Sequence, residues 1–230
     1  MAAIVHDHEL PSAEPSPAEH GNLAVDIFHH PALVRLRAEP QPDTAPAPAW
    51  TRAELAGRLC ELTGGADSAA LSAAMTLVRD AQLGGDPAAW ITARAATFHP
   101  PDAAAAGIDL AALVVVRARD ARTAGRAADV LLRSGAYGLV VLDLGTDAAM
   151  PTPLQGRLVQ LALKHDAAVL CLTEKGPDAP SLGSLVSLRA QVRRRRTAGG
   201  FTCALRVLKD KRRGPGWRWQ EACRGPDGLH

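Results

Sequence analysis

The sequence predicts an α/β fold with a mostly parallel sheet, flanking helices and a C-terminal antiparallel hairpin that extends the sheet. Several short runs are almost wholly apolar, which is typical of parallel strands buried on both faces. Helical patterns separate these runs, as in strand–helix–strand units. After Lys175 the pattern changes, because apolar and polar residues then alternate along the chain, which favours antiparallel strands.

The strand–helix alternation sets out the expected elements. We expect strands at 57–62, 88–93, 110–118, 137–145 and 167–175, and helices at 67–83, 123–135 and 153–166. In the first helix Leu71, Met75 and Val78 share one face, and Asp67 or Ser68 can cap its first turn. The run at 110–118 is apolar enough to predict a buried strand.

The C-terminal part is expected to form the hairpin. Residues 184–195 and 201–211 alternate apolar and polar side chains on either side of the turn sequence TAGG. Residues 217–221, WRWQE, are expected to add a third strand at the edge of the sheet.

The ends of the chain differ in composition from the body. Residues 1–50 are rich in Pro, Ala and Glu, so we expect a flexible tail with an extended linker near its end. Only 22–37 carries enough apolar side chains to be a candidate docking element, in which Phe28 and Val34 are candidate contacts. The body is expected at 51–222, and 223–230 are expected to be disordered.

Composition narrows the function classes. Hydrophobic residues make up 47% of the chain but aromatic residues only 3%, so the core must be aliphatic. No apolar run approaches the roughly 20 residues of a membrane span, and the N-terminus lacks the apolar core of a signal peptide. We therefore expect a cytoplasmic protein without a membrane partner, and four reduced cysteines.

Charge is unevenly distributed. The net charge is +2, but from Ser184 onward 12 Lys and Arg stand against 3 Asp and Glu. A basic C-terminal region indicates an acidic protein partner or nucleic acid.

Residues 61–72, ELTGGADSAALS, have the setting of a phosphate-binding loop without its chemistry. Such a loop reads G-x-x-x-x-G-K-[ST], because its lysine binds phosphate and its hydroxyl binds magnesium. Here Gly64 begins the loop, but Ala70 stands at the lysine position and Leu71 at the hydroxyl position. Tight nucleotide binding is therefore not expected.

The order of these segments resembles the RecA-type recombinase core over roughly 50–220. GRLCELTGGADSAALS matches the strand, phosphate loop and helix, and AADVLLRSGAYGLVVLDLG matches the helix and Walker B strand that ends at Asp143. CLTEK stands at the position of the glutamine sensor, and ALRVLKDKRRGP resembles the basic strand at the ATP-bridged subunit interface.

The departures from the RecA pattern decide the expected activity. Arg94 aligns with the catalytic glutamate and Glu174 with the sensor glutamine, so only Asp143 survives. We expect a protein that is not an enzyme and that uses no cofactor. Histidine pairs in the tail lack the further ligands of a zinc site, so no metal is expected either.

The chain is similar to the ImuA family, RecA-like relatives of the SulA cell-division inhibitors. The resemblance implies a non-catalytic accessory factor of SOS mutagenesis and translesion synthesis. It also implies an ImuB-like inactive polymerase subunit and RecA as partners. Three rival interpretations stay open: a SulA-like division inhibitor, a DNA-binding module that uses the basic hairpin, and a weak ATPase.

The candidate partner or DNA contacts in the body are basic or aromatic. They are Arg193, Arg194, Arg195, Arg196, Lys209, Lys211, Arg212, Arg213, Trp217 and Trp219. For the arginine run, DNA contact, an acidic protein partner and simple solvation all remain open. The two tryptophans either pack an edge strand on the core or form an exposed contact pair.

Overall fold

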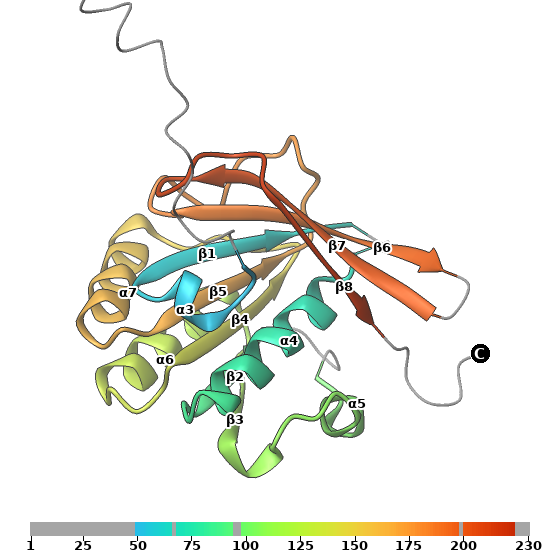
Figure 1. The fold of residues 1–230 in the computed structure, drawn as a ribbon. Coiled ribbons are helices and arrows are strands. Elements are labelled where there is room, and N and C mark those ends of the chain that lie inside the picture. Colours follow the sequence, from blue (N-terminus) through green and yellow to red (C-terminus); the bar gives the residue numbers. More distant parts are fainter. Residues whose placement is uncertain (1–48, 66–67, 94–97, 198–199, 224–230) are drawn as a thin grey trace, which may run out of the picture. The chain divides into compact units, whose positions relative to one another are not determined.

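An eight-stranded mixed sheet forms the centre of the fold (Figure 1). The computed structural model describes residues 49–65, 68–93, 98–197 and 200–223. Its elements in chain order are α3 (Arg52–Leu55), β1 (Arg58–Thr63), α4 (Ala70–Leu83), β2 (Ala88–Thr92), α5 (Pro100–Ala105), the 3-10 helix η1 (Leu110–Ala112), β3 (Leu113–Arg117), α6 (Ala121–Arg133), β4 (Leu139–Gly145), α7 (Thr152–Lys164), β5 (Ala168–Thr173), β6 (Leu188–Thr197), β7 (Gly200–Asp210) and β8 (Arg218–Cys223).

The strand order confirms the predicted fold class. The sheet runs β3-β2-β4-β5-β1-β6-β7-β8. Pairing is parallel from β3 across to β6, and antiparallel between β6 and β7 and between β7 and β8. The C-terminal hairpin therefore extends a parallel sheet, as the change of pattern after Lys175 predicts.

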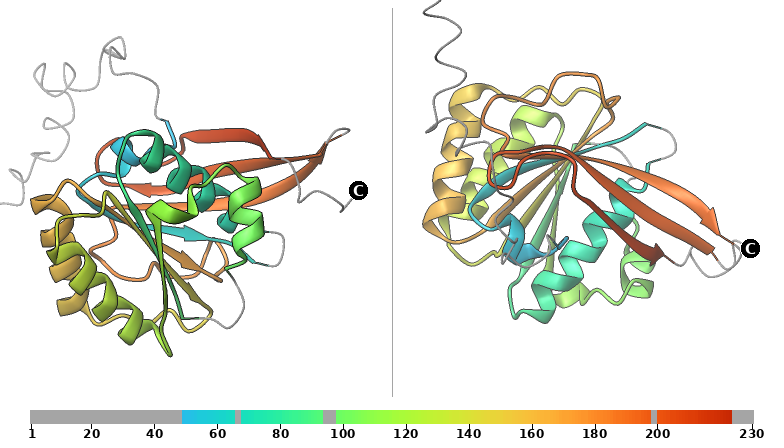
Figure 2. Two further views of the ribbon diagram at one scale, coloured as in Figure 1. Left: turned by 90° about the horizontal axis from the view of Figure 1, so that it is seen from below. Right: turned by 45° about the horizontal axis from the view of Figure 1, so that its top comes forward.

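Helices cover both faces of the parallel strands. Figure 2 shows α6 and α7 together on one side and α4 on the other. Along β1 successive side chains enter different cores: Cys60 and Leu62 join Leu77 of α4, whereas Leu59 joins Leu158 of α7. Because β2, β4 and β5 are buried over their whole length, their sequences are mostly apolar without alternation. β1 is equally buried but carries two charged residues, Arg58 and Glu61.

The prediction of a buried strand at 110–118 is wrong. The strand β3 is shorter, and it lies at the outer edge of the sheet beside β2. Val114 and Val115 are 39% and 38% exposed. An apolar run of this length cannot by itself distinguish a central strand from an edge strand.

Two helix starts show how local hydrogen bonds set the boundaries. Asp120 caps α6 by accepting the Thr123 N–H, which moves the start two residues ahead of the predicted 123. The helix α4 begins at Ala70 rather than at the predicted 67. The methyl group of Ala69, at the cap position, cannot accept a hydrogen bond.

The C-terminal strands bring two cysteines together, contrary to the expectation of four reduced thiols. Cys203 of β7 and Cys223 of β8 form a disulfide between neighbouring strands. Cys60 and Cys171 are free and buried, and burial raises the pKa of the Cys60 thiol to about 12. Spacing along the chain did not indicate the pair, because the strand register alone places the two sulfurs within reach.

Some predictions concern parts of the chain that the structure does not describe. The tail contacts Phe28 and Val34 lie outside the described residues, as does Arg94. Trp50, at the end of the predicted linker, is only 2% exposed and donates its indole N–H to Ala73 O at 2.9 Å. In the described part of the chain, no helix is long and apolar enough to cross a bilayer.

Candidate functional site

The predicted phosphate-loop residues lie at the carboxyl ends of the parallel strands. Gly64 follows β1, and Asp143 is a buried residue of β4. Between these two strands lies β5, which pairs with both. In open α/β sheets this edge is where ligands bind, so the topology puts the candidate residues at the ordinary position of a site.

In the described part of the loop, the side chain of Ser68 lies against Gly64 and the start of α4. Ser68 donates its N–H to Gly65 O at 2.9 Å, and its Oγ accepts the Ala70 N–H at 3.1 Å. A Cβ placed on Gly64 would lie 2.6 Å from Ser68 Cβ, so the serine side chain packs directly against this glycine. In a working phosphate loop, N–H groups at the start of the helix bind the anion. Here a hydroxyl of the chain already engages one of them.

The remaining residues predicted for the nucleotide site do not form a charged cluster in this structure. Leu71 is 41% exposed on the first turn of α4, and neither it nor Ala70 can supply a cation or a metal ligand. Glu174, the residue at the sensor position, is exposed and donates its backbone N–H to Gly145 O at 2.9 Å. Asp143 is 2% exposed, and its backbone carbonyl accepts the Ala93 N–H at 2.9 Å.

We predict that Gly64→Ala lowers the free energy of unfolding by about 1–3 kcal/mol, because the new methyl group overlaps Ser68. The carbonyl oxygen of Val192 lies 3.2 Å from the same point and limits relaxation on that side. Urea unfolding measures the change. The double variant G64A/S68G removes the obstructing side chain and should recover most of the loss. An equal loss in both variants would show that Ser68 does not pack against Gly64.

A buried ion pair holds the segment after β5, and sequence reasoning missed it. Glu61 of β1 is fully buried and accepts hydrogen bonds from Thr173 Oγ1 (2.9 Å), Ser181 Oγ (2.9 Å) and the Leu182 N–H (2.8 Å). Arg189 Nε lies 3.6 Å from the same carboxylate.

The arginine of this pair binds the other end of the segment. Arg189 donates to the carbonyl oxygens of Ala179 at 2.5 Å and Gly176 at 3.0 Å. The segment 175–183 is therefore fixed to the sheet by buried charges. The available signal was a glutamate inside an otherwise apolar strand, because an ionised group in that position needs a partner.

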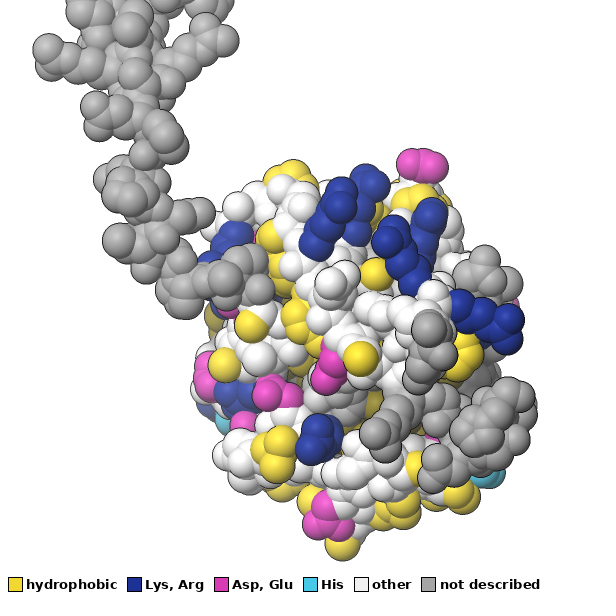
Figure 3. Space-filling view, turned by 45° about the vertical axis from the view of Figure 1, so that its right-hand side comes forward, with side chains coloured by type: hydrophobic (Ala, Val, Ile, Leu, Met, Phe, Trp, Pro, Cys, Tyr) yellow, Lys and Arg dark blue, Asp and Glu magenta, His cyan; other side chains and the backbone are white. Residues whose placement is uncertain are grey.

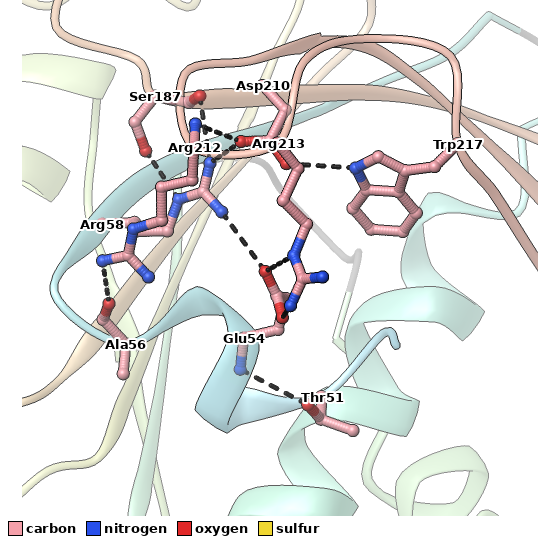
Figure 4. Close-up of polar contacts among 9 residues, drawn as sticks. All are labelled: Thr51, Glu54, Ala56, Arg58, Ser187, Asp210, Arg212, Arg213 and Trp217. Carbon is pink, nitrogen blue, oxygen red and sulfur yellow. Dashed lines mark hydrogen bonds and ion pairs between the residues drawn. The ribbon is translucent and has the colours of Figure 1, made fainter. Parts of the chain in front are cut away.

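A second polar network surrounds the start of β1 and occupies several predicted contact residues (Figure 4). Arg58 and Asp210 form a buried ion pair at 2.6 Å. Arg213 binds both carboxylate oxygens of Glu54, at 3.0 and 2.9 Å. Arg212 donates to Ala56 O at 2.9 Å. These contacts join the end of β7 and the turn after it to α3 and β1.

The other predicted contact residues near this network also form contacts within the protein. Lys211 Nζ donates to Ser184 O at 2.7 Å, and Trp217 Nε1 donates to Asp210 at 3.0 Å. Burial lowers the pKa of Lys209 below its ordinary value, and the charge of Lys211 lowers it further. Trp219 packs on the core beside Trp50, with ring centroids 6.4 Å apart. Whether any of these residues also meets a partner stays a prediction.

The arginine run divides between the two faces of β6. Arg194 and Arg196 share the face of Phe201, over whose ring Arg194 lies at 5.0 Å. Arg193 and Arg195 share the other face. All four are exposed. Figure 3 shows Lys and Arg side chains close together in the upper part of that view, the level at which the C-terminal strands lie in Figure 1.

The fold defines a RecA-like α/β core, in which Ala70 and Leu71 begin the helix after β1. The strand order, the loop after β1 and the buried aspartate of β4 carry this assignment.

Comparison with known proteins agrees with a RecA-like core. The chain is 34% identical over 131 residues to protein RecA of Corynebacterium urealyticum, covering 51% of this chain and 34% of that RecA. It is 33% identical over 129 residues to protein RecA of Salinispora tropica, covering 51% of this chain and 36% of that RecA. The chain thus spans about a third of the length of these relatives. No family model matches the chain.

A solved structure supports the same fold. The crystal structure of the RadB recombinase superposes with a TM-score of 0.56 at 15% sequence identity, covering 73% of this chain and 88% of that one. At this identity the likeness concerns the fold, which agrees with the sheet order described above.

Proposed function

We propose that this chain is a non-catalytic, RecA-related factor in DNA repair, an accessory protein of SOS mutagenesis and translesion synthesis. The observation that carries the proposal is the phosphate loop: alanine and leucine stand at the chemically active positions, and Ser68 Oγ accepts the Ala70 N–H. Phosphoryl transfer depends on positioned cations and a magnesium ion around the triphosphate. With alanine at the lysine position and leucine at the hydroxyl position, this segment supplies neither.

The proposed partners are RecA and an ImuB-like inactive polymerase subunit. The similarity to RecA over half of this chain supports a shared mode of subunit contact. The N-terminal segment 22–37, with Phe28 and Val34, would imitate the element that RecA subunits exchange. A RecA relative that binds a filament end without ATP would cap or dismantle the filament, and so shift repair from recombination to lesion bypass.

Calorimetry with Mg-ATP tests the first half of the proposal. The full chain should give no micromolar association, while RecA of Corynebacterium urealyticum serves as the positive control. Micromolar binding, or ATP turnover that Asp143→Asn abolishes, would contradict a non-catalytic role.

Recovery of partners from DNA-damaged cells tests the second half. The tagged full chain should recover RecA and the inactive polymerase subunit, and the variant F28A/V34A should lose RecA. Purified protein in excess should also inhibit RecA strand exchange. Recovery of the tubulin-like division protein instead, or strand exchange that stays unchanged, would reject the proposed partners.

A further inference from the structure

The three C-terminal strands carry an exposed basic face. In the strand register Arg206 of β7 lies opposite Gln191 of β6 and opposite Arg218 of β8. Directly opposite residues share a face, so Gln191, Arg206 and Arg218 lie on one side of the sheet. Because side chains two residues apart on a strand also share a face, Arg193 and Arg195 lie on the same side as Gln191. The four arginines of this face, Arg193, Arg195, Arg206 and Arg218, are all exposed. We call this set the arginine face.

Nothing in the described protein neutralises the arginine face. None of its four guanidinium groups forms an ion pair with another described residue. Arg206 and Arg218 are direct cross-strand neighbours, and like charges in that position destabilise a sheet. A bound anion would offset this repulsion.

The shape of the face fits an extended anion rather than a single phosphate. An open depression of about 490 Å³ lies over it, and its lining consists of the four arginines with Gln191, Ala204, Leu205, Trp219 and Gln220. Residues two apart on a strand are about 6.8 Å apart, and neighbouring strands about 4.8 Å apart. The guanidinium groups therefore form a two-dimensional array, and the planar fork of each one suits a phosphate group.

Among the described residues, the arginine face presents no aromatic side chain, which favours duplex DNA over single-stranded nucleic acid or a protein as its partner. Phe201 lies under Arg194 on the opposite side, and the ring of Trp219, a residue that also borders the depression, packs against Trp50 on that same opposite side. Single-stranded nucleic acid is usually held by stacking of its bases on aromatic rings, and protein interfaces by buried aromatic anchors. A face of arginine and glutamine offers neither. Duplex DNA needs neither, because its bases are already stacked and its phosphates are presented outward.

We propose that the arginine face of β6–β8 binds the phosphate backbone of duplex DNA without reading its sequence. This inference goes beyond the proposed function and does not rest on it, since it requires neither RecA nor the loss of ATP binding. The site also differs from the segment 175–183, which lies over Glu61 and Arg189 and is held there by their hydrogen bonds.

Binding of the full-length chain to a fluorescent duplex of mixed sequence tests the proposal. If the four arginines each engage a phosphate, the logarithm of affinity should fall with the logarithm of salt at a slope of about −3.6. R193Q/R195Q should weaken binding by roughly tenfold or more and reduce the magnitude of that slope by about 1.8. R206Q/R218Q should act alike.

The matched control is R194Q/R196Q, which removes the same charge from the same strand but from the opposite face. It should keep the salt slope within about 0.5 of the parent value. Equal losses in the control and in R193Q/R195Q would overturn the proposal, because they would show a general effect of net charge. Thermal unfolding of each variant identifies any loss caused by misfolding, and R206Q/R218Q then replaces a misfolded R193Q/R195Q.

Two further probes separate the competing partners. A single strand of the same length should bind more weakly than the duplex, and polyglutamate should not compete at equal charge concentration. Preference for the single strand, or binding of polyglutamate but not of DNA, would each overturn the duplex assignment. Failure of these tests would leave the ATP and RecA experiments unaffected.

Discussion

Replacing Asp210 with alanine is expected to lower the free energy of unfolding by about 3–5 kcal/mol. The carboxylate is fully buried and accepts hydrogen bonds from Arg58 Nη2 at 2.6 Å, the Arg212 N–H at 2.8 Å and Trp217 Nε1 at 3.0 Å. Its removal leaves the buried guanidinium of Arg58 without its nearest counter-charge. The unpaired charge would destabilise the contact between β1 and the end of β7, which the ion pair joins.

Two controls separate the ion pair from the simple loss of an acid. Asp147→Ala removes an exposed carboxylate and should change stability by less than about 0.5 kcal/mol. The double variant R58M/D210L replaces the pair by apolar groups and should be clearly more stable than D210A. Urea unfolding of all three gives the comparison. A D210A loss no greater than that of D147A would contradict the role of the pair.

The same carboxylate should make stability depend on pH in the acid range. Burial raises the pKa of Asp210, but hydrogen bonds from Arg212, Trp217 and Arg58 outweigh it, so this pKa lies below its ordinary value of 3.8. The native state therefore favours the ionised form. Its contribution is present above the unfolded pKa and is lost as the pH falls through the folded pKa. The acid loss of unfolding free energy should be smaller in D210N than in the parent.

Replacing Glu61 with alanine should cost about 3–5 kcal/mol and release the segment 175–183. The carboxylate binds Ser181 and Leu182 at one end of the segment and lies beside Arg189, which binds Ala179. Without it, the buried Arg189 loses its counter-charge and the Leu182 N–H loses its acceptor. The segment should then open locally more often than the sheet unfolds.

Urea unfolding and limited trypsin digestion at Lys175 measure the two consequences. E61A should be cleaved at Lys175 faster than the parent under native conditions. Glu61→Gln keeps an acceptor oxygen without the charge and should give an intermediate result. Asp178→Ala, which changes an exposed residue of the same segment, should leave both readouts near the parent values. Unchanged cleavage in a destabilised E61A would show that the carboxylate does not hold the segment.

The sequence alone predicted the parts of this protein that depend on local pattern. The mostly apolar runs of β4 and β5 indicate parallel strands, because such strands are buried on both faces. The alternation around TAGG indicates the β6–β7 hairpin, because one face of that hairpin is solvated. The loss of the phosphate-loop chemistry at Ala70 and Leu71 is likewise visible in the residue types.

Only the tertiary structure decided which side chains meet across long separations. Local pattern could not show that Glu61 pairs with Arg189, that Cys203 faces Cys223, or that β3 lies at an exposed edge. Nor could it place Arg206 and Arg218 beside the arginine run. Each of these facts depends on strand order and register, which arise from packing of the whole sheet rather than from neighbouring residues in the chain.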